Sequence, residues 1–156
     1  MGLHENMRSE PVSNLSLRTA VEMQASQTIR ESVQAMRTAQ LGCVVVVDDH
    51  RKPVGLFTEA MLRTLMAKST DVLDHQLEAE MATTYPWAQA GDSIEMVVDA
   101  MEAKNARFVV VVDDAGQLAG LTGQKGLMEY VAEHFPGEVM VQRIGTAPYP
   151  ARREGA

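Results

Sequence analysis

The sequence predicts an α/β fold in which two copies of a β-α-β-β-α unit pack together with pseudo-twofold symmetry. A repeat is the first observation behind this prediction, because the segment Cys43–Asp49, which reads CVVVVDD, returns as FVVVVDD at Phe108–Asp114. The same offset of 65 residues aligns positions in helix, strand and turn without a gap. The aligned identical pairs include Ile29 with Ile94, Val33 with Val98, Ala35 with Ala100, Met36 with Met101, Gly55 with Gly120 and Leu56 with Leu121. A register kept through three kinds of element indicates a duplicated unit.

The valine runs predict the long strand of each unit. Four consecutive β-branched residues without polar alternation are typical of a strand covered on both faces, as in a sheet with helices against it. Turns rich in aspartate follow at residues 48–53 and 113–117. We expect a second strand after each turn, at residues 54–57 and 118–122, so that each unit contains a hairpin.

Two helices are expected in each unit, one before the hairpin and one after it. The first begins after a polar residue that can cap a helix, Thr28 in one unit and Asp92-Ser93 in the other. Its apolar residues recur at helical spacing, as in Ile94, Val98 and Met101, which predicts one buried stripe. The second helix is predicted at about residues 59–67 and 124–134.

The pattern divides the chain into five segments. Pro136 and Gly137 stop the last helix, and residues 138–144 alternate like one further strand. The predicted segments are a flexible N-terminal segment (1–15), the first repeat (16–68), a connector (69–80), the second repeat (81–135) and a C-terminal extension with an extra strand and a mobile tail (136–156).

Composition and charge exclude several classes of protein. A net charge of −7 argues against a nucleic-acid binder, which needs a basic face to displace counterions from phosphates. The first residues lack the apolar core of a signal peptide, and no apolar run approaches the roughly 20 residues that span a bilayer. The single cysteine, Cys43, permits no intrachain disulfide and fits a reducing compartment. We therefore expect a cytoplasmic protein with no nucleic-acid or membrane partner.

The order of helix, VVVVD strand, turn and Gly-Leu-x-Thr-like strand end resembles the CBS-domain family, named for cystathionine β-synthase. Two such units in tandem resemble a Bateman module, and the resemblance covers about residues 17–133. It implies a stand-alone CBS domain-containing protein whose sheets face each other and leave two clefts. In the family these clefts often hold AMP, ADP, ATP or S-adenosylmethionine. The resemblance also implies a homodimer.

The ligand prediction depends on a family motif, Gly-h-h-Thr/Ser-x-x-Asp, where h is apolar. In that motif the hydroxyl meets phosphate, and the Asp accepts hydrogen bonds from ribose hydroxyls. The first repeat has the hydroxyl, Thr58, but Met61 stands at the Asp position. In the second repeat Gly123 and Gly126 stand at the hydroxyl and Asp positions. Neither repeat therefore carries the full motif.

By resemblance, the ligand contacts the segment entering each unit, the start of the long strand and the motif. Trp87 either stacks on a base or anchors the connector to the core. Arg107 either meets a phosphate or is an ordinary surface side chain. Lys125 brings positive charge to the free amides of a helix start. The predicted ligand-binding residues are Val21, Gly42, Cys43, Thr58, Met61, Trp87, Ala88, Arg107, Phe108 and Lys125.

No catalytic or metal site is predicted. The four histidines are scattered without metal-ligand spacing, and no nucleophile has an identifiable base and orienting partner. We predict a non-catalytic regulatory module that requires no cofactor, binds an adenosine-containing ligand between its repeats, and transmits this to a partner protein encoded elsewhere. The alternative is a ligand-free scaffold or dimerisation module with degenerate clefts.

Overall fold

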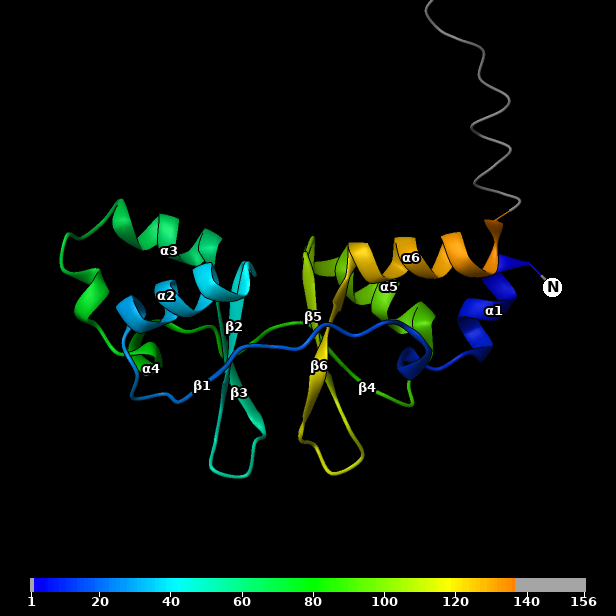
Figure 1. Ribbon diagram of the computed structural model, residues 1–156, viewed down its shortest axis with the longest axis horizontal. Coiled ribbons are helices and arrows are strands. Elements are labelled where there is room, and N and C mark those ends of the chain that lie inside the picture. Colours follow the sequence, from blue (N-terminus) through cyan, green and yellow to red (C-terminus); the bar gives the residue numbers. More distant parts are fainter. Residues whose placement is uncertain (1, 137–156) are drawn as a thin grey trace, which may run out of the picture.

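Each repeat forms a three-stranded sheet with two helices on its outer side, and the two sheets face each other (Figure 1). The computed structural model describes residues 2–136. The first repeat contains β1 (Glu22–Met23), α2 (Ile29–Ala39), β2 (Cys43–Val47), β3 (Pro53–Thr58) and α3 (Glu59–Met66). The second contains β4 (Trp87–Gln89), α5 (Ile94–Lys104), β5 (Phe108–Val112), β6 (Leu118–Gly123) and α6 (Gln124–His134). The predicted fold class and element order are confirmed.

The strand register shows how closely the two repeats match. In each sheet the short first strand runs parallel to the long strand, which pairs antiparallel with the third. Cys43 lies opposite Thr58, and Phe108 lies opposite Gly123, at the 65-residue offset. A residue in one repeat can therefore be compared directly with the residue 65 positions away in the other repeat, here called its mirror residue.

The consecutive valines are buried on both faces, as predicted. Val45 and Val47 of β2 lie between the two sheets with Val110 and Val112 of β5. The alternate β2 residues, Val44 and Val46, face the helices of the first repeat with Phe57 and Ile29. Since successive side chains of a strand point to opposite faces, an all-apolar run suits a strand that has no solvent-exposed face.

The N-terminal segment differs from the flexible stretch that the sequence predicts. It forms α1 (Leu3–Ser9) and the 3-10 helix η1 (Val12–Asn14), which pack on the second repeat before the chain crosses to β1 (Figure 1). Val12 is fully buried, and the Tyr130 hydroxyl donates to Glu10 Oε2 at 2.9 Å. The Tyr130–Glu10 contact joins residues 120 positions apart, so local sequence patterns do not reveal it.

The connector is also ordered. It contains the 3-10 helix η2 (Val72–Asp74) and α4 (Leu77–Glu80), and it buries Val72 and Leu77. Leu77 packs in the core of the first repeat. The predicted cap of α2 is confirmed, because the Glu31 amide donates to Thr28 Oγ1 at 3.2 Å. The extra strand predicted at residues 138–144 lies outside the described residues.

Candidate ligand clefts between the repeats

Two cavities open between the repeats, one at the start of α6 and one at the start of α3. The first, here called the α6 cleft, has a volume of about 290 Å³, and the second, the α3 cleft, about 320 Å³. Gly42, Glu59, Arg107 and Phe108 line both clefts. The two clefts are therefore neighbouring sites that share a wall.

Backbone pairing between the repeats builds each cleft. The Arg18 amide donates to the Leu121 carbonyl at 2.8 Å, and the Leu121 amide donates back at 2.9 Å. Leu56 and Ala82 exchange a similar pair of bonds, both at 2.9 Å. The segment that enters one repeat is thus held against the hairpin of the other, so each cleft is lined by both repeats.

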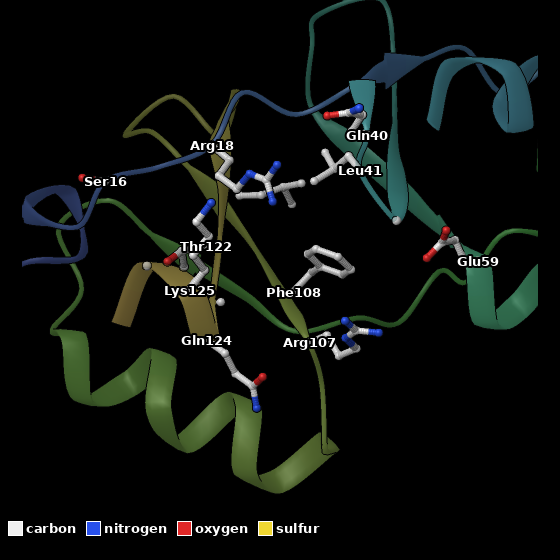
Figure 2. A pocket seen from close by; sticks show the side chains of 14 residues that line it. Ser16, Arg18, Gln40, Leu41, Glu59, Arg107, Phe108, Thr122, Gln124 and Lys125 are labelled. Atoms are coloured by element: carbon white, nitrogen blue, oxygen red, sulfur yellow. The ribbon is translucent and has the colours of Figure 1, made fainter. Parts of the chain in front are cut away.

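The start of α6 has the properties of an anion site. Thr122, one of the residues that line the α6 cleft, is 3% exposed, and its buried hydroxyl has no hydrogen-bond partner among residues 2–136. No side chain caps α6, so the first amides of this 11-residue helix are free of a side-chain partner. Figure 2 shows the Lys125 side chain beside Thr122, extending toward Arg18. Free amides, a helix dipole and two cations together favour a bound phosphate or carboxylate.

The start of α3 differs, because it is already capped. The Met61 amide donates to Thr58 Oγ1 at 3.2 Å, so the motif hydroxyl of the first repeat satisfies its own helix. Glu59, whose side chain is exposed, lines both clefts and does not distinguish them. The α3 cleft therefore offers an anion fewer free donors than the α6 cleft does.

Positive side chains outnumber negative ones in the α6 cleft. Arg18, Arg107 and Lys125 line the α6 cleft against one carboxylate, that of Glu59.

Burial raises the pKa of the Cys43 thiol to about 12, and the nearby Arg18 charge only partly opposes this rise. Because a thiol with this pKa stays protonated near neutral pH, Cys43 serves as core and not as a nucleophile.

Close backbone packing explains why the second repeat departs from the family motif. A Cβ atom added at Gly123 would overlap the carbonyl oxygen of Arg107, the residue before β5. A Cβ at Gly126 would lie 2.7 Å from Thr122 Oγ1. A side chain at either position would overlap atoms of the present packing, and the Thr122 hydroxyl, one residue earlier on β6, lies on the opposite face of the strand.

The structure brings five of the ten predicted site residues to the two clefts. Gly42, Arg107 and Phe108 line both, Thr58 lines the α3 cleft, and Lys125 lines the α6 cleft. Trp87 lines a third cavity beside the hairpin turns. The remaining four, of which Cys43 and Ala88 are buried in the core, are not among the residues lining these three cavities: Val21, Cys43, Met61 and Ala88.

Sequence reasoning missed Arg18, Glu59 and Thr122. The family motif places the hydroxyl position at Gly123, so it does not point to Thr122. Arg18 reaches the cleft only through its backbone pairing with Leu121, which the sequence does not show. Among residues 2–136, no group of three or more His, Cys, Asp or Glu side chains is placed to hold a metal ion. No helix within the same range is long and apolar enough to cross a membrane.

Two facing repeats with two adjacent cavities between them define a tandem-repeat module. The model of the CBS domain matches residues 12–68 and 76–133, so this chain belongs to the CBS-domain family. Pairs of these domains are regulatory modules.

Known relatives agree with this assignment. An uncharacterised protein of Methanopyrus kandleri is 23% identical over 79% of this chain and 63% of its own length. The glycine betaine/carnitine/choline transport ATP-binding protein OpuCA of Bacillus subtilis is 24% identical over 83% of this chain and 33% of its own length. The chain thus spans less than two thirds of both relatives.

A solved structure shares the fold. The CBS domain pair of protein MJ0100, in complex with 5′-methylthioadenosine and S-adenosyl-L-methionine, superposes with a TM-score of 0.69 at 19% identity. The match covers 83% of this chain and 98% of that one.

Proposed function

We propose that this chain is a non-catalytic regulatory module that binds an adenosine-containing ligand, such as AMP, ADP, ATP or S-adenosylmethionine, between its repeats. The α6 cleft is the primary site. The observation that carries this proposal is that the uncapped start of α6 lies in the cleft that Arg18, Arg107 and Lys125 also line. Free backbone amides and nearby cations in one cavity favour a bound phosphate or carboxylate.

The ligand class is supported by charge and by a relative. Arg18, Arg107 and Lys125 suit a phosphate, or the carboxylate of S-adenosylmethionine, at the mouth of the α6 cleft. Phe108 offers an apolar surface in the same cavity for a base (Figure 2). The domain pair of MJ0100 was solved with two adenosine-containing ligands.

Regulation follows if the ligand prefers one arrangement of the repeats. Arg18 belongs to the first repeat and Leu121 to the second, and both line the α6 cleft. A ligand that contacts both repeats therefore favours the relative arrangement of the repeats that fits it best. Only this difference in affinity can shift the equilibrium. A partner protein that binds only one arrangement would then bind more or less tightly when the ligand is present. The similarity to OpuCA makes transport proteins one candidate class of partner.

The alternative function is a ligand-free scaffold, or a dimerisation module that pairs with a second copy of the chain. Met61 and Gly126 favour it, because both repeats lack the carboxylate with which family members hold ribose. The two functions differ in whether an adenosine compound stabilises the folded protein.

Thermal unfolding with and without millimolar AMP, ADP, ATP or S-adenosylmethionine tests the proposal. A ligand at ten times its Kd stabilises the native state by about 1.4 kcal/mol, which raises the midpoint by about 3–6 °C in a chain of this size. Lys125→Ala should reduce the shift. Lys104→Ala, which removes an exposed lysine outside both clefts, should leave it unchanged.

The opposite outcome is equally informative. If protein refolded free of ligand shows no shift with any of the four compounds, the adenosine proposal is wrong and the scaffold function is favoured.

A further inference from the structure

A third cavity, of about 300 Å³, lies beside the two hairpin turns, which point away from α3 and α6 (Figure 1). Trp87 and Tyr85 provide aromatic surface, and Lys52, Pro53 and Gly116 come from the turns. We call this the Trp87 cavity. The residues that line it are not among those that line the α3 and α6 clefts.

The first repeat closes the mirror position with its own side chains. At the 65-residue offset, Glu22 corresponds to Trp87 and Arg51 corresponds to Gly116. Arg51 donates to both Glu22 carboxylate oxygens, at 3.0 and 2.8 Å, and to the Leu118 carbonyl at 3.2 Å. A planar guanidinium therefore occupies the space that the second repeat leaves open.

Backbone conformation is not the cause of the difference, because both turns adopt the same left-handed geometry. The φ angle is 59° at Arg51 and 81° at Gly116. The difference lies in the side chains: Gly116 contributes none, and Trp87 replaces the carboxylate that would hold a cation.

A proline also removes a bond between the turns. On the closed side the Leu118 amide donates to the Arg51 carbonyl at 2.9 Å. The residue that mirrors Leu118 is Pro53, which has no amide hydrogen to donate to Gly116. Three sequence differences at mirror positions therefore combine to open one cavity.

The lining of the cavity defines the ligand that it suits. Trp87 is 55% exposed, and Tyr85, which lines the same cavity, is half-buried, with its pKa raised by that burial. The Lys52 side chain lies along Gly116, with Cε 3.8 Å from the position of a glycine Cβ. Lys52 has no ion-pair partner among the described residues.

The first aspartate of each turn is already engaged with backbone amides, and Asp48 Oδ1 accepts from the His50 and Lys52 amides at 2.8 and 2.9 Å. Asp113 Oδ1 accepts from the Ala115 and Gln117 amides, both at 2.9 Å, within its own turn. The mirror residue of Lys52 is Gln117, an uncharged side chain, so the free ammonium group is a feature of the open side alone.

We propose that the Trp87 cavity binds a small aromatic carboxylate, with its ring against Trp87 and Tyr85 and its carboxylate at the Lys52 ammonium group. The ring takes the place that the Arg51 guanidinium fills in the other repeat. Flat aromatic surfaces favour stacking of such a ring, and charge complementarity with Lys52 sets the preference for an anion. This site is independent of adenosine binding in the α6 cleft.

Trp87 is the only tryptophan in the chain, so its fluorescence reports on this cavity. Benzoate, benzamide and benzamidine serve as probes because they share one ring and carry negative, zero and positive charge. Benzoate should shift the emission to shorter wavelength and saturate. Benzamide should bind about fivefold more weakly, the effect of one partly exposed ion pair, and benzamidine more weakly still. A linear, non-saturating response to benzoate, or tighter binding of benzamidine, would overturn the proposal.

Substitutions of the lining residues test where benzoate binds. Lys52→Gln should weaken benzoate binding about fivefold, whereas Lys104→Gln should not change it. Gly116→Arg, which introduces the side chain found at the mirror position, should abolish the saturable response. Its midpoint of unfolding should stay near that of the parent protein. If Gly116→Arg does not fold, the Lys52→Gln and Lys104→Gln pair decides. A benzoate response that is lost in Lys125→Ala and kept in Lys52→Gln would place the ligand in the α6 cleft and contradict the proposal, whatever the result with adenosine compounds.

Discussion

Phe57→Ala is expected to lower the free energy of unfolding by about 3–5 kcal/mol, a large part of the total stability of a domain. Phe57 is among the largest fully buried side chains of the protein, and it packs between β2 and the helices of the first repeat. Truncating it removes apolar contacts and leaves a cavity that a close-packed core cannot fully collapse. Urea denaturation monitored by circular dichroism measures the change.

Val54→Ala is the matched control on the same strand. Val54 is 37% exposed, so its truncation should cost well under 1 kcal/mol. Equal losses from the two substitutions would mean that the first repeat is not packed around Phe57 as described.

Gly123→Ala is expected to destabilise the protein by about 1–3 kcal/mol, because the added Cβ overlaps the Arg107 carbonyl oxygen. The atom that must move belongs to the backbone of Arg107, the residue before β5, so a side-chain rotation cannot relieve the overlap. Gly123→Thr, which restores the family hydroxyl, should cost more and should not strengthen adenosine binding. Thermal and urea unfolding, with ligand titration of the folded variants, measure both effects.

Gly91→Ala is the control with the opposite expected sign. No atom lies within 4 Å of a Cβ built at Gly91, so alanine there should be neutral or stabilise by about 0.4–1 kcal/mol through the unfolded chain. If Gly123→Thr instead folds with full stability and raises affinity, close packing is not the reason for the missing hydroxyl.

The repeated elements could be predicted because their signals are local. The valine runs, the turn residues and the stripe through Ile94 and Met101 recur at one offset, and each pattern has a single structural solution. Helix α1 could not be predicted in this way, since it is held by contacts such as Tyr130 with Glu10 that join distant parts of the chain.

The site was predicted less completely, for the same reason. Family motif positions directed attention to Met61 and Gly126, whereas the structure gathers its free donors around Thr122 and Arg18. The role of Trp87 also depended on tertiary structure, because only comparison with Glu22 at the mirror position shows that a cavity opens there.

Amide chemical shifts in a ¹H–¹⁵N NMR titration with AMP test the central claim most directly. We predict saturable shifts at Arg18, Arg107 and residues 122–126, where the α6 cleft lies, with little change around Trp87. Adenosine without the phosphate should bind more weakly and shift residues 122–126 less, because the anion contacts the start of α6. Shifts confined to other surfaces, or no shifts at millimolar AMP, would contradict the assignment of the α6 cleft as the site of an adenosine-containing ligand.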